Sequence, residues 1–277
     1  MSDRTPETAR LAAVASRAVR AGGDYLEDAF RDVSIEADYG VDDVTSAADR
    51  AAEDRVLAVI REAYPDHAVH GEESGRAGEH RYEWVVDPLD GTNNFAAGLP
   101  SFATAVCVLC DDRPLVSAIY EPLSDSLYLA RRGEGASAND DPIAAESDLA
   151  LERGTVSFAL GLSALRDDDH RAAAERVETA VDAECKRVIN TWSPCVDWGL
   201  LARGRIEGLV AYCPGVYEQY AGELLAAESG VESRVFDLDD LTPKTGPGVT
   251  GVGNLSVAAT DESKLDRLVD VVIDAAA

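Results

Sequence analysis

The chain of 277 residues carries 52 acidic and 25 basic side chains, which gives a formal net charge of −27 at pH 7. Such a negative field repels nucleic acid and anionic membranes, so the composition argues against both as partners. Neither a membrane-spanning run of roughly 20 apolar residues nor a signal peptide at residues 1–10 is evident, so we expect a soluble, cytoplasmic protein.

Apolar periodicity and turn residues predict the elements in chain order. Residues 5–31 and 47–63 have the spacing of amphipathic helices, although Gly22 and Gly23 are expected to bend the first one. Strands are predicted over 67–70, 83–87, 102–110, 115–120, 126–131 and 155–159, with antiparallel pairing where turn residues separate them. The later elements are helices over 168–183, 195–203, 217–229 and 262–276 and strands over 206–212 and 255–259.

This order of elements predicts the fold class. Helices come first, consecutive strands fill the middle, and both types mix at the end, which indicates an α+β fold rather than regular strand–helix alternation. Residues 136–148 form the loosest stretch. We therefore expect a single unit over 1–277 with an N-terminal half, 1–143, and a C-terminal half, 144–277.

The charge pattern weakens any argument from acidic residues alone. Lys186, Lys244 and Lys264 are the only lysines, and the other basic residues are arginines. Many carboxylates with few lysines suit a halophilic protein that stays hydrated in concentrated salt, where the screening length falls to roughly 3 Å. We interpret most of the acid as adaptation to a salty cytoplasm, so neighbouring carboxylates are weak evidence of a site.

The cysteines do not indicate a zinc site or a disulfide framework. Cys107 and Cys110 lie in an apolar segment that is typical of a buried strand, and Cys185, Cys195 and Cys213 are scattered. The histidines lack the spacing of zinc ligands. Free thiols in a reducing compartment are expected.

One group of carboxylates follows a predicted buried strand. Asp87 ends that strand, and Asp90 follows across a turn that Pro88 fixes, so both carboxylates can point to the same side. Gly91 and Thr92 then begin a helix or tight turn, whose free amides suit a phosphate. Carboxylates for a hard cation and backbone donors for an anion together predict a site for metal and phosphate.

Glu72 and Glu73 form a second group, on a turn after another short strand. Two interpretations of Glu72 and Glu73 are open. The first is an acidic loop in an acidic protein. The other is a metal site, because a charge beside a buried strand is costly unless it is paired or coordinated.

Two segments resemble the hallmark motifs of the inositol monophosphatase family, which includes archaeal fructose-1,6-bisphosphatases and nucleotide 3′-phosphatases. They are Gly-Glu-Glu-Ser at 71–74 and Trp-Val-Val-Asp-Pro-Leu-Asp-Gly-Thr-Asn-Asn-Phe at 84–95. The resemblance extends along the whole chain and implies a layered α/β/α/β/α sandwich with mostly antiparallel sheets. It also implies a Mg²⁺-dependent phosphomonoesterase that acts on inositol-1-phosphate or fructose-1,6-bisphosphate, and a homodimer.

The resemblance implies roles for individual residues. The metal ligands for two or three Mg²⁺ ions are Glu72, Asp87, the carbonyl of Leu89, Asp90 and Glu218. The catalytic residues are Asp49, Glu72 and Thr92, and Asp49 and Thr92 orient or deprotonate the metal-activated water that attacks the phosphate. The substrate-binding residues are Leu89, Asp90, Gly91, Thr92, Trp192, Ser193 and Glu218.

The assignment of Asp49 depends on the register of residues 43–49, which are similar to a D-x-V-T-x-x-D stretch of the family. In the preferred register Ser46 takes the place of the threonine and keeps its hydroxyl. The alternative, which uses Thr45, would put Ala48 in the place of the aspartate.

The chain departs from the family where the substrate alcohol would bind. The third motif, W-D-x-A-A-G, corresponds to 217–222, so its metal-binding aspartate is Glu218. The G-S-A-A stretch becomes Trp-Ser-Pro-Cys at 192–195, and a glutamate that contacts the inositol ring becomes Ala211, whereas Asp197 is retained. The resemblance therefore implies an intact hydrolytic half and a rebuilt substrate wall.

Several alternatives stay open. A haloacid-dehalogenase phosphatase would have its two aspartates two residues apart, whereas Asp87 and Asp90 are three apart. The altered third motif and substrate wall are also compatible with a non-catalytic binding or structural protein, and a nucleotide 3′-phosphatase is a further alternative. Trp192 would stack on a sugar or a base, or fill a core position. Arg187, Arg203 and Arg205 would supply a second phosphate site, although Arg203 and Arg205 flank the end of a predicted helix and would alternatively cap it.

Overall fold

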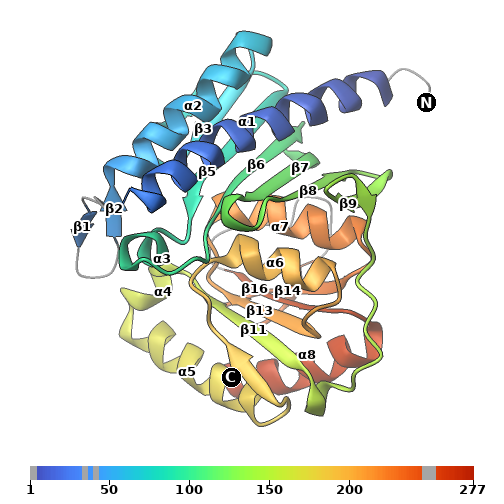
Figure 1. The fold of residues 1–277 in the computed structure, drawn as a ribbon. Coiled ribbons are helices and arrows are strands. Elements are labelled where there is room, and N and C mark those ends of the chain that lie inside the picture. Colours follow the sequence, from blue (N-terminus) through green and yellow to red (C-terminus); the bar gives the residue numbers. More distant parts are fainter. Residues whose placement is uncertain (1–4, 33–36, 40–43, 245–253) are drawn as a thin grey trace.

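The computed structural model describes residues 5–32, 37–39, 44–244 and 254–277. Two sheets alternate with three pairs of helices in five layers, which follow one another from top to bottom in Figure 1. The helix pairs are α1 (Thr5–Arg31) with α2 (Ala47–Ala63), α6 (Pro194–Ala202) with α7 (Val216–Glu228), and α5 (Asp168–Asp182) with α8 (Glu262–Ala276). The predicted α+β sandwich is confirmed.

The first sheet has eight strands and lies between the α1–α2 layer and the α6–α7 layer. In spatial order they are β10 (Asp141–Pro142), β9 (Gly135–Ala138), β8 (Ser126–Arg131), β7 (Arg113–Glu121), β6 (Ala103–Cys110), β5 (Tyr82–Asp90), β3 (Ala68–Gly71) and β4 (Gly75–Ala77). Among the described residues of this sheet, only β3 and β5 pair in parallel, so it is mostly antiparallel as expected.

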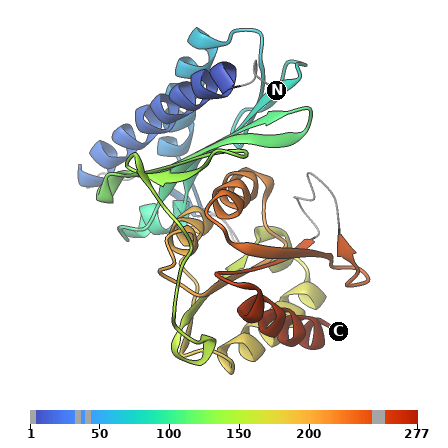
Figure 2. The same cartoon turned by 90° about the vertical axis from the view of Figure 1, so that its right-hand side faces the viewer.

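The second sheet has six strands between the α6–α7 layer and the α5–α8 layer (Figure 2). In spatial order they are β12 (Arg187–Ile189), β11 (Thr155–Leu160), β13 (Gly208–Tyr212), β16 (Asn254–Ala259), β14 (Glu232–Asp237) and β15 (Pro243–Lys244). β11 is parallel to both of its neighbours, and the other pairs are antiparallel.

Shorter elements complete the described chain. They are the ribbon β1 (Ala37–Tyr39) with β2 (Val44–Ser46), the helices α3 (Thr92–Ala97) and α4 (Leu162–Leu165), and 3₁₀ turns over Pro122–Ser124 and Leu151–Arg153. The side chains of Thr45 and Ser46 lie outside the described residues, as does the whole of Asp43. Among the described residues, no helix combines the length and apolar character that crossing a membrane needs.

Helix α1 continues through both of its central glycines, so they do not interrupt it. A Cβ atom on Gly23 would lie 2.4 Å from the ring of Tyr120, and one on Gly22 would lie 2.8 Å from Val56. The glycines therefore allow α1 to pack closely on β7 and α2. Their lower helix propensity is offset by the apolar face that α1 buries.

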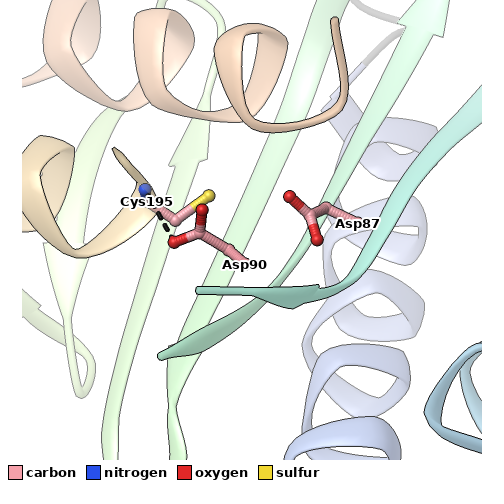
Figure 3. A group of neighbouring side chains, drawn as sticks. All are labelled: Asp87, Asp90 and Cys195. Carbon is pink, nitrogen blue, oxygen red and sulfur yellow. Dashed lines mark hydrogen bonds between the residues drawn. The ribbon is translucent and has the colours of Figure 1, made fainter. Parts of the chain in front are cut away.

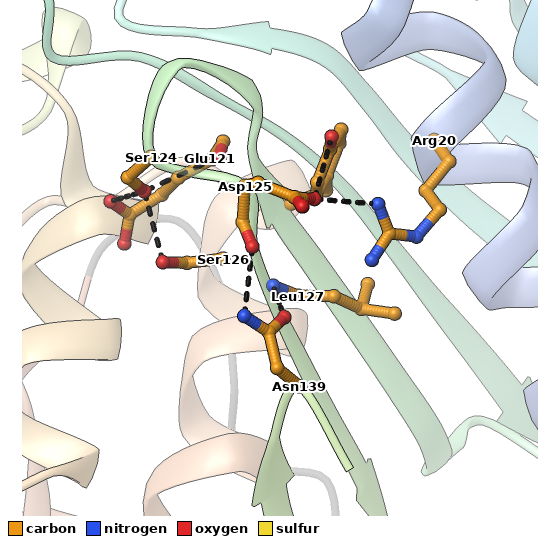
Figure 4. A network of polar contacts seen from close by, with 8 residues as sticks. Arg20, Glu121, Ser124, Asp125, Ser126, Leu127 and Asn139 are labelled. Carbon is orange, nitrogen blue, oxygen red and sulfur yellow. Dashed lines mark hydrogen bonds and ion pairs between the residues drawn. The ribbon is translucent and has the colours of Figure 1, made fainter.

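A polar network fixes the turn between β7 and β8 against α1 (Figure 4). Asp125 Oδ1 accepts hydrogen bonds from Arg20 Nη1 at 2.8 Å and from the Tyr120 hydroxyl at 3.2 Å. Asn139 Nδ2 donates to the carbonyl of Asp125 at 2.8 Å, and Leu127 N donates to Asn139 Oδ1 at 2.8 Å. Exposed ion pairs contribute about 0–1 kcal/mol, so this network orients the turn more than it stabilises the fold.

The predicted elements all occur, with ends that shift by three residues or fewer. The prediction of a loose stretch over 136–148 is partly wrong, because β9 and β10 extend the first sheet to Pro142. The first sheet uses residues 68–142 and the second uses 155–259, so the chain passes between them over 143–154. Strands β12 and β14 were not predicted, because their short or exposed sequences lack a clear apolar alternation.

Candidate active site

A bulge at the end of β5 positions the two central carboxylates, where a turn was expected. Asp87 lies opposite Ala105 of β6, and Asp90 lies opposite Ala103, so one extra residue is accommodated on β5. Residues three apart in a regular strand point to opposite faces, and the bulge brings both carboxylates to one side. Pro88 fits within the bulge because it has no N–H to contribute to the ladder.

The Asp87 and Asp90 carboxylates are buried and face a common space with Cys195 (Figure 3). Asp90 Oδ2 accepts hydrogen bonds from Ser193 Oγ at 2.5 Å and from the Cys195 amide at 2.9 Å. Asp87 Oδ1 is buried without a hydrogen-bond partner among the described residues. An unpaired buried carboxylate oxygen is costly, so this atom fits a cation ligand.

The electrostatics also fit a divalent cation. Burial, followed by repulsion from Glu72, Asp90 and Glu218, raises the pKa of Asp87 well above its ordinary value. Burial likewise raises the pKa of Asp90, against the opposing effect of its hydrogen bond from Ser193. Clustered acids in low-dielectric surroundings repel one another unless a positive charge lies between them. A hard divalent cation with oxygen ligands relieves this repulsion.

Glu72 and Glu218 line the same cavity as the two aspartates. The Glu72 amide donates to the carbonyl of Val86 at 3.2 Å, which joins the β3–β4 turn to β5. Glu218 Oε1 accepts a hydrogen bond from the Gly215 amide at 2.7 Å and thereby caps its own helix, α7. The longer glutamate thus reaches back to the helix N-terminus, and burial raises its pKa.

Glu73 has a different place from Glu72. Its carboxylate pairs with Arg50 at 3.1 Å, as in the acidic-loop interpretation. The buried carboxylate of Glu53 accepts hydrogen bonds from the amides of Glu73 and Ser74 at 2.9 Å each, and these bonds hold the β3–β4 turn. Sequence reasoning missed Glu53, because nothing in its helical pattern distinguishes it from the many surface acids.

Asp49 and Thr92 meet as the resemblance implied. Thr92 Oγ1 lies 3.0 Å from Asp49 Oδ1 and 3.0 Å from the carbonyl oxygen of Leu89. Thr92 begins α3, and Gly91 precedes it with φ of 88°. A Cβ atom on Gly91 would lie 2.9 Å from the carbonyl oxygen of Ser101, so both the conformation and the space require glycine.

A cavity of about 440 Å³ opens from the carboxylates toward the second sheet. Its lining also includes Trp192, Asn190, Ser163 and Arg166. Trp192 is 44% exposed, so it does not occupy a core position. Sequence reasoning missed Arg166, since a single arginine before an acidic run carries no distinctive signal.

Other residues singled out from the sequence lie outside the cavity lining. Arg203 Nε donates to the carbonyl of Gly199 at 3.2 Å, so it caps α6, and Arg187 Nε donates to Thr155 Oγ1 at 3.1 Å. Arg205 and Ala211 are also absent from the lining, and Ala211 packs in the core beside the second sheet. These three arginines therefore do not form the second phosphate site considered above.

Asp197 lies at the edge of the cavity and is buried. It accepts a hydrogen bond from Thr191 Oγ1 at 2.9 Å, and its burial raises its pKa to about 7. Asn94 Nδ2 donates to the carbonyl of Thr191 at 2.7 Å, so the loop before α6 is tied to α3. These contacts hold Trp192 and Ser193 in place.

Residues 7–268 match the inositol monophosphatase family, and the chain belongs to that family. It is 31% identical over 221 residues to the Nus factor SuhB of Escherichia coli, an alignment that covers 78% of this chain and 82% of that protein.

Solved structures share the fold. The inositol monophosphatase from Anabaena (Nostoc) superposes with a TM-score of 0.80 and 26% identity over 96% of each chain. The extragenic suppressor protein suhB from Bartonella henselae superposes with a TM-score of 0.83 and 25% identity, over 95% of this chain and 98% of the other. The layered arrangement is therefore that of inositol monophosphatases.

Proposed function

We propose that this chain is a Mg²⁺-dependent, cytoplasmic phosphomonoesterase of a small sugar or inositol phosphate, such as inositol-1-phosphate or fructose-1,6-bisphosphate. The observation that carries the proposal is the buried pair of Asp87 and Asp90, with the unpartnered Asp87 Oδ1, beside the cavity. The Thr92–Asp49 hydrogen bond supplies a hydroxyl–carboxylate pair next to it.

The residues that would hold two or three Mg²⁺ ions are Glu72, Asp87, Asp90, Glu218 and the carbonyl of Leu89. All offer oxygen atoms, which Mg²⁺ prefers. When bound, the cations neutralise phosphate oxygens and activate water as a nucleophile. Because Glu218 Oε1 already accepts the Gly215 amide, its other oxygen is the atom available to a cation.

The chain's own groups would orient the substrate and move the proton. The single Thr92 hydroxyl proton can be donated to Asp49 or to the Leu89 carbonyl, and donation to Asp49 leaves Oγ1 free to accept a proton from water. Asp49 would then take the proton through Thr92. The amides of Gly91 and Thr92 would contact the phosphate, and Trp192 and Ser193 would lie beside the rest of the substrate.

A substrate panel tests the proposal. The chain would be assayed for phosphate release from p-nitrophenyl phosphate, inositol-1-phosphate, fructose-1,6-bisphosphate and a nucleoside 3′,5′-bisphosphate, with Mg²⁺ in molar KCl. We expect release from at least one, and complete loss on chelation of the metal. No release from any, together with no heat of Mg²⁺ binding in calorimetry, would contradict the proposal.

Three alternative functions predict other results. The exposed ring of Trp192 at the cavity favours a nucleotide 3′-phosphatase as the second candidate. Preferential release of phosphate from the nucleoside 3′,5′-bisphosphate would support that function. Mg²⁺ binding without any turnover would instead favour a non-catalytic member, for which Glu218 and Trp192 are the altered positions. Formation of a phospho-aspartate would revive the haloacid-dehalogenase alternative.

The proposed partners follow from charge and resemblance. The net charge of −27 opposes nucleic acid and anionic membranes, so neither is proposed as a partner. Some relatives are named Nus factors. An electrophoretic mobility assay with RNA would test the proposal that nucleic acid is not a partner of this chain. A homodimer is proposed from the family resemblance, and sedimentation would measure it.

A further inference from the structure

The thiol of Cys195 lies within the carboxylate cluster. Its Sγ and one carboxylate oxygen each from Asp87 and Asp90 all lie within 4.8 Å of one another. All three residues are buried, and Cys195 has no exposed surface. Figure 3 shows the sulfur atom and the two carboxylates directed into a common space from α6 and β5.

The position of the thiol is fixed by the chain on both sides. Cys195 lies in the first turn of α6, which begins at Pro194. Its amide donates to Asp90 Oδ2, the same oxygen that accepts Ser193 Oγ. The Cys195 backbone is therefore held against the Asp90 carboxylate, and Sγ lies within the cluster.

A buried cysteine often serves only as a small apolar side chain, and Cys195 does pack against a core cluster. An independent feature points to a ligand instead. Asp87 Oδ1 is buried and has no hydrogen-bond partner among the described residues, and one oxygen of the same carboxylate lies in the cluster. A cation bound by Asp87 would satisfy that oxygen, and Cys195 Sγ lies close enough to both aspartates to share such a cation.

Sulfur changes which cations the cluster prefers. Mg²⁺ selects oxygen ligands, whereas thiolates select softer ions such as Zn²⁺, whose bonds are about 2.3 Å to sulfur and about 2.0–2.2 Å to carboxylate oxygen. We propose that Asp87, Asp90 and Cys195 form a mixed oxygen–sulfur site for a thiophilic divalent cation, which competes with Mg²⁺. On binding, the S–H bond breaks, its proton leaves to solvent, and a sulfur–metal bond forms.

This inference shares two carboxylates with the proposed phosphatase, but cation binding can be measured without turnover. The consequence for the proposed enzyme is inhibition by Zn²⁺ that Mg²⁺ relieves only at high concentration. A chain with Mg²⁺-ligating oxygens alone would not show such selectivity, because its ligands would offer no soft atom.

Cobalt absorption tests the sulfur ligand directly. The full chain would be titrated with Co²⁺ under reducing conditions without substrate, and the near-ultraviolet thiolate-to-cobalt charge-transfer band recorded. We expect the band in the wild type and its loss in both Cys195→Ala and Cys195→Ser, of which serine changes the shape least. Zn²⁺ affinity should fall at least about tenfold in these variants.

Two matched thiols serve as controls. Cys213 also lines the cavity, and Cys107 is a buried cysteine on β6, so Cys213→Ala and Cys107→Ala should both keep the band. Absence of the band in the wild type, or its persistence in the Cys195 variants, would overturn the inference. A wild type that shows the band but releases no phosphate would retain this site and reject the phosphatase.

Discussion

Trp192 holds a backbone conformation that a bulky side chain seldom adopts, with φ of 56°. The loop around it is held by the hydrogen bonds from Asn94 to Thr191 and from Ser193 to Asp90. Strained residues persist where the surroundings over-determine them, often at binding sites. The loop thus displays an exposed indole at the cavity, where the ring is available to stack on a planar part of the substrate.

Replacing Trp192 should therefore change substrate preference more than chemistry. Trp192→Ala is expected to raise KM for a nucleoside 3′,5′-bisphosphate by about two- to tenfold, since an aromatic pair contributes about 0.5–1.5 kcal/mol. KM for p-nitrophenyl phosphate provides the comparison within the same variant. Leu149, 48% exposed and absent from the cavity lining, gives the control Leu149→Ala. The same fold-change in KM, relative to the wild type, for both substrates would reject the stacking role.

The Thr92 hydroxyl has a sharper expected effect. Thr92→Val removes the donor to Asp49 while keeping the side-chain shape, so kcat should fall by about 10²–10⁴, the usual contribution of general acid–base groups. Thr92→Ser keeps the hydroxyl and should retain most of the rate. Circular dichroism would verify that both variants are folded. A valine variant as fast as the wild type would show that the Thr92–Asp49 pair moves no proton.

At the scale of the element, the β5 bulge explains how residues close in sequence form one site. The Pro88 carbonyl accepts Thr104 Oγ1 at 2.9 Å, so the bulge is satisfied by the neighbouring strand. Pro88 signalled a break in the strand from the sequence alone. The register with β6 depends on pairing between distant segments, and for that reason a turn was predicted where the strand continues to Asp90.

The bulge also creates repulsion that should destabilise the metal-free chain at neutral pH. Because burial raises the folded-state pKa of Asp87 above its ordinary value of 3.8, the folded state binds more protons than the unfolded state as pH rises past that value. The stability that Asp87 contributes is therefore fully present below pH 3.8 and is lost as pH rises through its raised folded-state pKa. The contribution of buried Asp197 is lost in the same way between pH 3.8 and about pH 7.

Asp87→Asn should therefore raise the free energy of unfolding of the metal-free protein at pH 7 by about 1.4 kcal/mol for each unit of pKa shift removed, and its Tm should rise with it. The gain should shrink near pH 4, and saturating Mg²⁺ should reverse the order by stabilising only the wild type. Exposed Asp239 gives the control Asp239→Asn. A Tm of Asp87→Asn below that of the wild type, measured with a chelator at pH 7, would contradict the proposed repulsion among the buried carboxylates.

At the scale of the whole molecule, periodicity identified most elements, and the resemblance at 71–74 and 84–95 implied their layering. The parallel pairs of β11 with β12 and β13 could not be predicted, because they join segments far apart in the chain. The same limit applies to the site. Asp87 and Asp90 stood out by their motif, whereas Arg166 joins the cavity, and the Cys195 thiol joins the two carboxylates, only through the fold.

The net charge of −27 predicts that salt stabilises the whole molecule. Screening weakens repulsion among surface carboxylates, so Tm should rise between about 0.1 M and about 2 M KCl. A gain of about 2 kcal/mol would correspond to roughly 4–8 °C for a chain of this size class. Scanning calorimetry with sucrose as a nonionic control would separate screening from excluded volume. An unchanged or lower Tm in KCl would contradict the halophilic interpretation.

Asp90→Asn gives the most direct test of the metal-dependent phosphatase. Asparagine keeps an oxygen that can accept from Ser193 and Cys195, so the variant should fold, but it removes the charge that a cation needs. Phosphate release and Mg²⁺ binding would be measured side by side with the wild type. We expect turnover to fall by at least about 100-fold with weakened Mg²⁺ binding. Retained turnover in a folded Asp90→Asn chain would show that the buried carboxylates do not hold the catalytic metal.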